Sequence, residues 1–421
     1  MVQVILYAIF PSFQNLQNTL PASANMTTQQ FIGFVVFCFF QVPLVMIKPE
    51  KTQILFRYAN IVAGVTMLSV TIWALSTAHG GGPILVQNST LVTSSEKAWA
   101  MIRAITTVIG GIAVSLTNQS DFNRFARRPG DQVAGQIYST IVMGLLVTLM
   151  GTLSTSAAAK IYGEVLWSPA ELALRWMQDG YTAKSRAAAV FAAGGFLVSQ
   201  LAINTVDNLW PGGFDISALF PRWVNIRRGA FITSALGVAI NPWQLADTAN
   251  TFINVLDGYS VFLGPMVGMM VCDFWVVRKR KFKLSHLYMP TEDSIYWYHH
   301  GFNWRAFVSW FVGMAPALPG FVNAVNPNIK VPAGAQEIFY LAYIEGFALG
   351  FLVHYTLNYF FPVPGLGLID EEDLYATFSV DEAKKLGVIP HSMYLEGVEV
   401  EVEGLSTPEE NKAVGITLKA F

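Results

Sequence analysis

One long apolar segment, about residues 187–210, carries an unusual number of polar side chains. Asn204 and Asn208 are four residues apart, so in a helix they lie on one face together with Gln200. Asp207 places a carboxylate inside the same apolar segment, which is costly and marks a candidate functional site. Amide and carboxylate groups supply both hydrogen-bond donors and acceptors, as a polar heterocycle with ring amides would require. The alternative is a purely structural hydrogen-bond cluster between helices.

A second candidate site is the glycine pair Gly110-Gly111, near the middle of the apolar segment 99–117. Glycine costs about 1 kcal/mol relative to alanine inside a helix, so the pair predicts an unwound segment or a close contact with another helix. An unwound segment would expose helix ends and free carbonyls to a ligand near the middle of a membrane. A close contact would be the small-residue packing that is common among membrane helices. The residues alone leave both alternatives open.

These candidate residues lie in apolar runs that are long enough to cross a lipid bilayer. A spanning helix needs roughly 20 apolar residues, whereas the strands of a membrane barrel are shorter and alternate in polarity. We therefore predict helices, of which the sixth is the shortest and the weakest prediction. The nine expected spans are about Phe31–Ile47, Tyr58–Ala78, Trp99–Thr117, Gly135–Ala159, Ala187–Trp210, Gly229–Trp243, Ile253–Val277, Trp304–Val325 and Ile338–Phe361.

The composition agrees with a membrane protein and argues against several other classes. Of 421 residues, 53% are hydrophobic and only 13% are charged, whereas a soluble chain is about 25% charged. No basic stripe of the kind that binds nucleic acid is visible. The sequence has neither an ATP-binding loop nor a hydrolase nucleophile motif, so we expect neither an ATP-driven pump nor an enzyme. Cys38 and Cys272 lie in apolar runs and indicate neither a disulfide framework nor a metal site.

The basic residues predict how the spans are oriented. The first, third, fifth and seventh gaps between spans, counted together with Arg305 at the start of the eighth span, hold 15 Lys and Arg residues, and the other gaps hold 6. Because basic loops remain in the cytoplasm, the odd-numbered gaps and the end of the chain are predicted to be cytoplasmic. The final segment, residues 362–421, holds 12 acidic residues and 4 lysines. We expect this acidic tail to be largely disordered.

The first residues form a short apolar run, Val2–Phe13, which Pro11 interrupts. This run is too short to cross the roughly 30 Å hydrocarbon core of a bilayer. It is either the outer half of a helix whose inner half is missing or a segment that lies at the membrane surface. The chain thus divides into this stub, residues 1–13, a transmembrane body, residues 14–361, and the tail, residues 362–421.

Three further ionisable residues lie within the expected spans. Glu345 and His354 could form a proton relay, but nine residues separate them, which is about 13 Å along a helix axis. We therefore favour structural roles for both. Arg103 lies near the outer end of its span, where its long side chain could extend to the membrane surface.

Several short stretches, taken together and in this order, resemble a known family. They are Asn18–Ser23, Phe31–Phe34, Asp121–Pro129, Ile226–Gly229, Tyr259–Leu263, Val271–Lys279 and Asn303–Arg305. The set resembles the fungal Fur-type branch of the nucleobase:cation symporter-1 family, the uracil, allantoin and uridine permeases. The resemblance covers nearly the whole chain up to about Pro364.

The resemblance implies an all-α transporter fold, a five-plus-five inverted repeat with two more helices at its end. The nine expected spans would be the fourth to the twelfth, and the stub would be the outer half of the third. On this scheme the chain lacks the first two helices and most of the third, which is what a gene model that begins at an internal methionine would produce. The family's first helix and the substrate-contacting Trp and Gln of its third helix are then absent from this chain.

The resemblance also implies a function. The expected activity is import of a nucleobase-like heterocycle, such as uracil or allantoin, across the plasma membrane by alternating access, driven by the proton gradient without a cofactor. The expected partners are this small molecule, the lipid bilayer and, at the tail, the cytoplasmic trafficking machinery. The alternative is a truncated protein that does not transport and serves as a remnant, a regulatory partner or a sensor.

Individual residues take roles from the resemblance. Asn208 matches the family's substrate-binding asparagine, whereas Asp207 departs from the small residue expected beside it and receives no role. Ile112 stands just after the expected break, where relatives often have an aromatic ring. Ala202 and Ile203 stand near positions where sodium-coupled members use hydroxyl groups, so proton coupling is favoured over sodium. The candidate substrate-binding residues are Gly110, Gly111, Ile112, Gln200, Asn204, Asp207 and Asn208.

The resemblance places an outer gate in the span 253–277. Phe262, Leu263 and Gly264 match the family's gate region, and Gly264 with Pro265 could provide its hinge.

Overall fold

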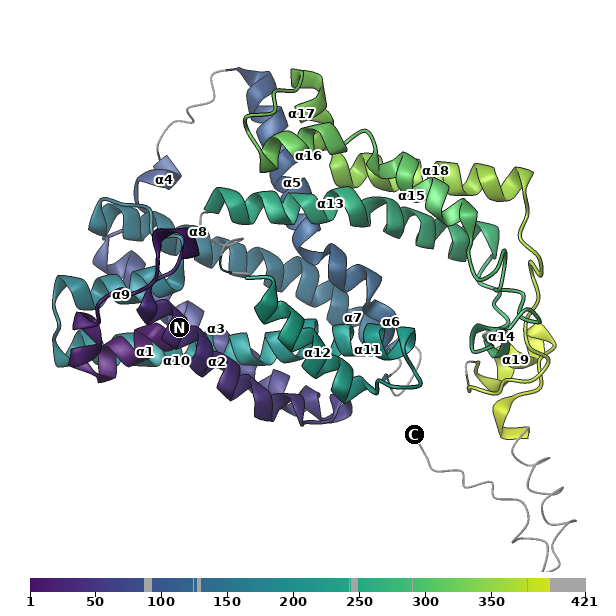
Figure 1. Ribbon diagram of the computed structural model, residues 1–421, viewed down its shortest axis with the longest axis horizontal. Coiled ribbons are helices and arrows are strands. Elements are labelled where there is room, and N and C mark those ends of the chain that lie inside the picture. The colour runs from purple at the N-terminus through teal and green to yellow at the C-terminus, as the bar shows by residue number, and fades with distance from the viewer. Residues whose placement is uncertain are drawn as a thin grey trace, which may run out of the picture. The chain divides into compact units, whose positions relative to one another are not determined.

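The computed structural model describes residues 1–86, 93–123, 125–126, 130–241, 243, 249–289, 291–376 and 378–393. Within these residues the regular secondary structure is helical, apart from two isolated bridges. The expected all-α class is therefore confirmed for the described part of the chain. Its longer helices are α2 (Thr28–Val45), α3 (Thr52–Thr77), α5 (Ser94–Thr117), α8 (Gly144–Tyr162), α9 (Pro169–Asp179), α10 (Ala183–Ile203), α11 (Trp210–Leu219), α12 (Ile226–Ala239), α13 (Ala249–Val271), α15 (Trp304–Met314) and α18 (Ala342–Phe360) (Figure 1).

Shorter helices connect or precede the long ones. Three segments, Tyr138–Met143, Asn204–Leu209 and Cys272–Val277, are π-helical turns that continue α-helices. The shorter α-helices are α1 (Val2–Ile9), α4 (Pro83–Val86), α6 (Gln119–Asn123), α7 (Asp131–Ile137), α14 (Leu284–Leu287), α16 (Leu318–Val325), α17 (Ala333–Tyr340) and α19 (Val380–Leu386).

The described helices include six that are long and apolar enough to cross a membrane, and up to eight if two broken pairs each count as one span. The pairs are α15 with α16 and α17 with α18. Nine spans were expected, so the count of nine is not confirmed. The sixth expected span, Gly229–Trp243, falls on α12, which has 14 residues and is about 21 Å long at 1.5 Å per residue. Residues 242 and 244–248 of that region lie outside the described residues.

Several spans begin at a capping box, which explains where they start. At α2, Thr27 Oγ1 accepts the N–H of Gln30 at 3.2 Å, and Gln30 Oε1 accepts the N–H of Thr27 at 2.7 Å. The same reciprocal pairing occurs between Thr93 and Glu96 before α5. These bonds satisfy N–H groups that would otherwise lack partners at the first turn of a helix.

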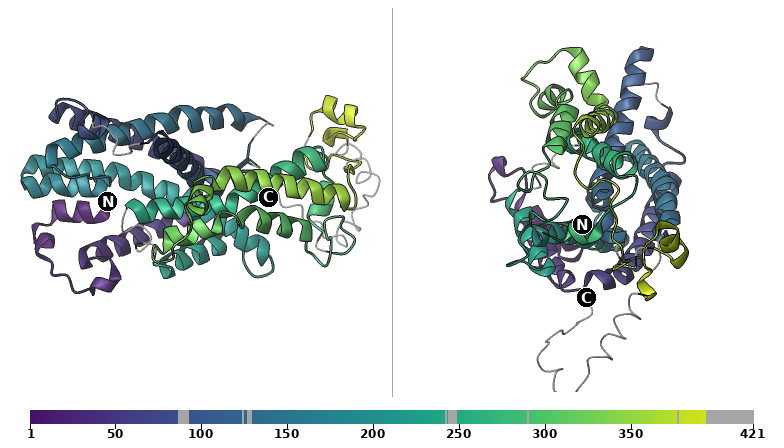
Figure 2. Two further views of the ribbon diagram at one scale, coloured as in Figure 1. Left: turned by 90° about the horizontal axis from the view of Figure 1, so that it is seen from above. Right: turned by 90° about the vertical axis from the view of Figure 1, so that its right-hand side faces the viewer.

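The chain divides into two compact units, Met1–Ser260 with Gly320–Leu341, and Val261–Pro319 with Ala342–Phe421. In the first unit, α3 packs against both α8 and α10 (Figures 1 and 2). Small residues permit the close approach, since a Cβ added at Gly195 of α10 would lie 2.0 Å from Thr66 Oγ1 of α3. This is the small-residue packing typical of membrane helices.

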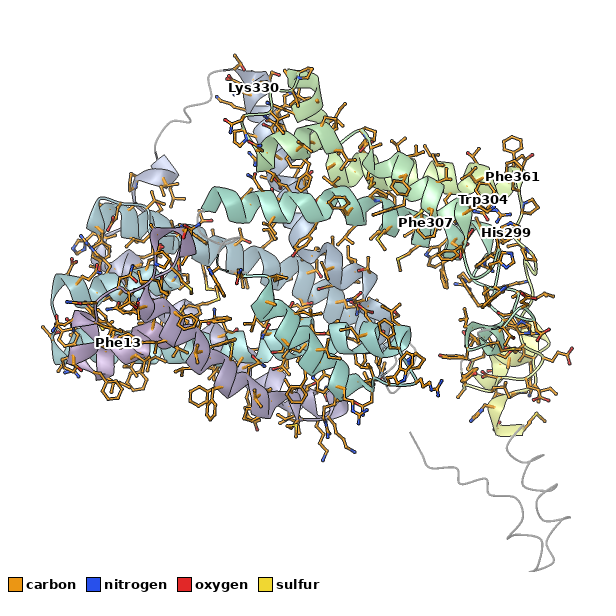
Figure 3. All side chains as sticks on the ribbon, viewed as in Figure 1. Phe13, His299, Trp304, Phe307, Lys330 and Phe361 are labelled. Carbon is orange, nitrogen blue, oxygen red and sulfur yellow. The ribbon has the colours of Figure 1, made fainter. Side chains whose placement is uncertain are left out.

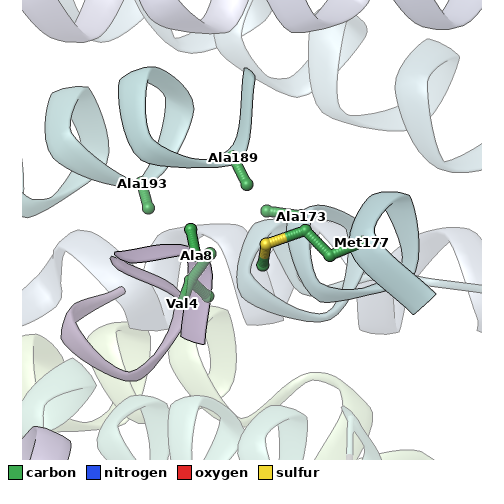
Figure 4. Close-up of a cluster of buried hydrophobic side chains, with 6 residues drawn as sticks. All are labelled: Val4, Ala8, Ala173, Met177, Ala189 and Ala193. Atoms are coloured by element: carbon green, nitrogen blue, oxygen red, sulfur yellow. The ribbon is translucent and has the colours of Figure 1, made fainter. Parts of the chain in front are cut away.

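The stub forms α1, which ends at Ile9 and packs against α9 and α10. A buried cluster joins the three helices and comprises Val4, Ala8, Ala173, Met177, Ala189 and Ala193 (Figure 4). Tyr181 Oη donates to Tyr7 O at 2.7 Å, and Arg186 Nε donates to Ala8 O at 2.7 Å. These side chains cap carbonyls at the C-terminal end of α1, which have no intrahelical partner. The origin of the stub as half of a longer helix stays a prediction.

In the second unit, α15 and α18 pack together around Pro265 of α13. A Cβ added at Gly313, Gly346 or Gly350 would lie within 2.8 Å of an atom of Pro265. Arg305, at the start of α15, donates from Nε to Phe361 O at 2.6 Å and so caps the end of α18. The rings of Trp304 and Phe361 meet edge to face at the same place (Figure 3).

The acidic tail is described only as far as residue 393. Its helix α19 begins at a capping box between Ser379 and Glu382, and these hydrogen bonds lower the pKa of the Glu382 carboxyl. Asp370 accepts hydrogen bonds from the backbone N–H and the hydroxyl of Ser285, which lies on α14. Residues 394–421, where most of the expected disorder falls, lie outside the described residues.

Candidate functional site

The polar face predicted for the segment 187–210 lies where α10 passes into the π-helical turn Asn204–Leu209. In this turn the N–H of Trp210 donates to Thr205 O, five residues earlier. Pro211 follows directly and has no N–H to give to the carbonyl of Asp207, four residues earlier. The local sequence thus favours a departure from regular α-helix here, and such π-helical turns are frequent at functional sites.

A chain of hydrogen bonds runs from this turn to α2. Asn208 Nδ2 donates to Asn204 Oδ1 at 3.0 Å, and Asn204 Nδ2 donates to Gln41 Oε1 at 3.2 Å. Gln41 Nε2 donates to Thr205 Oγ1 at 2.5 Å, and that hydroxyl donates to Leu201 O at 2.7 Å. We call Asn208, Asn204, Gln41 and Thr205 the amide relay.

The burial of the amide relay increases along its length. Gln41 is 3% exposed and Thr205 is fully buried, whereas Asn204 is half-buried and Asn208 is exposed. The buried end satisfies the polar groups that would be costly to leave unpaired in an apolar interior. The exposed end presents the carbonyl oxygen and remaining N–H of Asn208, which form an acceptor and a donor side by side. This arrangement can pair with a ligand that carries adjacent N–H and C=O groups.

The other residues predicted on this helix have different surroundings. The side chain of Gln200 is exposed, one turn before Asn204. Asp207 is also exposed, and its carboxylate makes no ion pair within the described residues. The structure therefore joins Asn204 and Asn208 in one cluster and leaves Gln200 and Asp207 outside it. Gln41 was missed by sequence reasoning, although a glutamine in an apolar span is itself a signal of a polar function.

The predicted break at Gly110-Gly111 is wrong, because α5 is a continuous helix from Ser94 to Thr117. A Cβ added at Gly110 would lie 2.3 Å from Leu256 O and 2.5 Å from Ser260 Oγ of α13. Glycine is therefore needed here for close helix packing, the other alternative that the sequence left open. Gly111 and Ile112 are exposed on the same helix.

A charged cluster that the sequence did not predict holds α5 against α13 in the first unit. Arg103 Nε lies 3.2 Å from Asp257 Oδ2, and Arg103 Nη2 donates to Asn254 Oδ1 at 3.1 Å. Thr107 Oγ1 donates to the other carboxylate oxygen of Asp257. The guanidinium also lies 5.4 Å from the centre of the Tyr340 ring. Arg103 is thus paired within the protein, which corrects the expectation that it extends to the membrane surface.

The predicted gate residues lie in the second unit, in the part of α13 that begins at Val261. Trp310 Nε1 donates to Phe262 O at 2.9 Å. A Cβ added at Gly264 would lie 2.9 Å from Tyr343 O of α18. Leu263 is half-buried. These contacts fix the backbone around Pro265, and the roles of Phe262, Leu263 and Gly264 as a gate stay predictions.

The ionisable residues of the last span do not pair with each other. His354 Nε2 lies 3.6 Å from Asp273 Oδ1, and Asp273 Oδ2 accepts from Arg278 Nε at 2.8 Å. Arg278 Nη2 donates to the hydroxyl of Tyr298 at 2.7 Å, and burial raises the pKa of that phenol. Among the described residues, no group of three or more His, Cys, Asp or Glu side chains could hold a metal ion.

A family model described as permease for cytosine/purines, uracil, thiamine and allantoin matches residues 1–346. The transporter aclS of Aspergillus oryzae is 40% identical over 92% of this chain and 68% of its own length. Nicotinamide riboside transporter 1 of Saccharomyces cerevisiae is 32% identical over 93% of this chain and 65% of its own. The uracil permease of the same yeast is 33% identical over 86% of this chain and 58% of its own. The chain thus spans about two thirds or less of the length of most of these relatives.

A solved structure has a similar fold. It is Mhp1, a nucleobase-cation-symport-1 family transporter in a closed conformation with bromovinylhydantoin bound. The TM-score is 0.58 at 21% identity, over 91% of this chain and 75% of that one. The apolar helices and the family match make this chain a multi-pass membrane protein of a transporter family, not an enzyme. The chain belongs to the family of permeases for cytosine/purines, uracil, thiamine and allantoin, which confirms its resemblance to the fungal nucleobase:cation symporter-1 permeases.

Proposed function

We propose that the protein is a secondary active transporter that imports a heterocycle with ring amides, such as uracil or allantoin, across the plasma membrane. The observation that carries this proposal is the amide relay. Its hydrogen bonds all run in one direction, from Asn208 through Asn204 to Gln41 and then to Thr205. Because every step has a defined donor and acceptor, the orientation of the Asn208 amide is fixed before a ligand arrives.

The chemistry of that amide favours lactams and ureides among the ligands of the relatives. Relatives between 30% and 34% identical include permeases for allantoin, uracil and uridine and transporters for thiamine and nicotinamide riboside. Overall similarity therefore does not select the substrate. Uracil and allantoin carry adjacent N–H and C=O groups that pair with one carboxamide in two hydrogen bonds. The positively charged rings of thiamine and nicotinamide riboside offer no such pair at the charged centre.

We further propose that transport is coupled to protons rather than to sodium. Next to Asn204 stand Ala202, which is fully buried, and Ile203, which is exposed, and neither offers an oxygen ligand from its side chain. The hydroxyl of Thr205 already bonds to Gln41 and Leu201. A sodium ion prefers several oxygen ligands, so this part of α10 is poorly suited to one.

Uptake of radiolabelled uracil and allantoin tests the proposed function. The protein is expressed in yeast cells that lack their own uracil and allantoin permeases, and uptake is measured with and without a protonophore and with sodium replaced by choline. We expect uptake that the protonophore abolishes and that sodium removal leaves unchanged. Absence of uptake of both uracil and allantoin by correctly localised protein would contradict the proposal. Uptake that requires sodium would contradict the coupling.

The proposed topology has a separate test. We propose that the tail is cytoplasmic, where it could meet the trafficking machinery. Basic residues concentrate in the odd-numbered gaps between the expected spans, and the tail, which follows the ninth span, lies on the same side of the membrane as these gaps. A fluorescent protein fused after residue 421 should give signal at the plasma membrane and be protected from protease added to intact cells. Digestion of the fused domain in intact cells would reverse the proposed orientation.

A further inference from the structure

A second group of carboxamide side chains gathers around a cavity in the first unit, apart from Asn208. The cavity has a volume of about 1030 Å³ and is lined by the beginning of α3, by α6 and by α7. Its carboxamides are Gln53, Asn60, Gln119, Asn123, Gln132 and Gln136. We call this cavity the carboxamide vestibule.

Some of these amides are held in place by one another. Asn123 Oδ1 accepts hydrogen bonds from Gln119 Nε2 at 3.0 Å and from Gln136 Nε2 at 3.5 Å. Within the part of the chain that the structure describes, the carbonyl oxygen of Gln132 is buried and accepts no hydrogen bond. A buried acceptor without a partner is costly, so a ligand N–H toward which the Gln132 side chain turns would relieve that cost.

The vestibule also offers flat apolar surface. Phe56, Phe122 and Phe125 contribute to its lining beside the amides. Aromatic rings bind planar groups by stacking or edge contacts. A planar ring with N–H and C=O groups on its edge can therefore satisfy both kinds of lining at once, which neither a lipid chain nor a simple ion can do.

The vestibule reaches the helix that carries the amide relay. Val206 lines the cavity, and it belongs to the π-helical turn between Asn204 and Asn208. The remaining lining residues belong to the first and third gaps between the expected spans or to the span ends beside them, and these gaps are rich in Lys and Arg. Because basic loops remain in the cytoplasm, this charge bias predicts that the lining residues lie on the cytoplasmic side of the membrane. The vestibule is thus placed between the relay and the cytoplasm.

We propose that the carboxamide vestibule is a second binding site for the transported heterocycle, which it holds between release from Asn208 and entry into the cytoplasm. The proposal rests on the proposed function and adds to it a site with its own residues. Small-molecule pockets are typically about 300–1,000 Å³, so this cavity is large for a single uracil ring. The ligand therefore shares it with water and binds weakly, as a release site requires.

Cysteine protection tests the vestibule without requiring transport. Gln136→Cys is introduced with Cys38→Ala and Cys272→Ala, and the purified protein in nanodiscs is labelled with a maleimide in the presence of uracil or allantoin. With uracil or allantoin present at about ten times its Kd, mass action leaves about a tenth of the sites unoccupied. Labelling by the maleimide should therefore slow about tenfold. The control is Gln178→Cys on α9, an exposed position at which labelling should be unaffected.

A second substitution separates the two sites. Asn208→Ala is added to the Gln136→Cys protein, and protection should persist because the vestibule does not use Asn208. If Gln136→Cys fails to fold, Gln53→Cys takes its place, since the Gln53 side chain is exposed and lines the same cavity. Labelling that neither probe slows would overturn the proposal. Protection that disappears with Asn208→Ala would also overturn it, since it would then report binding at the relay.

The outcomes distinguish this inference from the proposed function. Protection without cellular uptake would support the vestibule and contradict the transport proposal. Uptake without protection would support the transport proposal and contradict the proposed binding site in the vestibule. In vesicles, Gln132→Leu should raise the apparent KM for substrate on the cytoplasmic face about tenfold and leave the external KM unchanged, which corresponds to about 1.4 kcal/mol. An equal change on both faces, or none, would contradict a site on the cytoplasmic side.

Discussion

Removing one partner of the Arg103–Asp257 pair should destabilise the protein strongly. Asp257 is 2% exposed, and its carboxylate is held by Arg103 Nε at 3.2 Å and by the hydroxyl of Thr107. Arg103→Met leaves that carboxylate buried with the hydroxyl as its remaining partner. Breaking a buried ion pair typically costs 3–5 kcal/mol, and we expect about 3 kcal/mol because water can reach the Arg103 side chain, which is 36% exposed.

A double-mutant cycle measures how much of that cost is due to the pair. Asp257→Asn removes the charge and keeps the shape, so the double variant Arg103→Met/Asp257→Asn should lose about 2 kcal/mol less than the sum of the single losses. The assay is the free energy of unfolding in mixed micelles of SDS and a mild detergent. The control is Arg222→Met, at an exposed arginine, where we expect less than about 0.5 kcal/mol. A cost below about 1 kcal/mol for Arg103→Met, or single losses that simply add, would refute this reasoning.

Three further predictions concern packing, the tail and pH. Gly195→Val should lower the free energy of unfolding by about 1–3 kcal/mol or more, since its Cβ would lie 2.0 Å from Thr66 Oγ1; unchanged melting in detergent would contradict this packing. Asp370→Ala removes the acceptor for the N–H of Ser285, at 3.1 Å, which is worth about 1 kcal/mol and should speed proteolysis of residues 364–376 about fivefold. Equal cleavage rates for the variant and the wild type would argue against this attachment of the tail. Burial raises the pKa of Tyr298 from 10.0, so its contribution to stability is complete below the unfolded pKa and is lost as the pH rises through the folded pKa. Tyr298→Phe should therefore lose less stability than the wild type above about pH 10, and identical pH profiles in circular dichroism melts would contradict the assignment.

The polar face around Asn204 could be predicted because it depends on local spacing. Residues four apart lie on one side of a helix whatever that helix packs against, and the two asparagines do form a hydrogen bond. The partner Gln41 lies more than 160 residues away in sequence, and no periodic pattern connects it to α10. The π-helical turn likewise depends on how α10 continues past Pro211, for which the proline was only a partial signal.

The expected break at Gly110 failed for a physical reason. Glycine lowers helix propensity, but it also removes the Cβ that would keep two helices apart. Which effect applies depends on what lies opposite, and here the carbonyl of Leu256 occupies the space. The same limit applies to the ion pair of α5 and α13, because an arginine in a span has the same sequence signal whether it extends to the surface or meets an aspartate.

The span count shows a different limit. Apolar runs locate helices reliably, and six of the expected spans coincide with single long helices. The sixth expected span corresponds to α12, which is a helix of only 14 residues. Composition records how apolar a run is, whereas its helical length depends on turns that form at either end.

In the proposed function, the amide of Asn208 is oriented by the amide relay and binds the transported heterocycle. The most direct test of this binding is the uptake of radiolabelled uracil and allantoin by yeast expressing Asn208→Ala, with Asn328→Ala, at an exposed position, as the matched control. We expect Asn208→Ala to abolish uptake while the protein still reaches the plasma membrane, and Asn328→Ala to transport like the wild type. Wild-type uptake by Asn208→Ala would contradict the proposed binding of the heterocycle by Asn208.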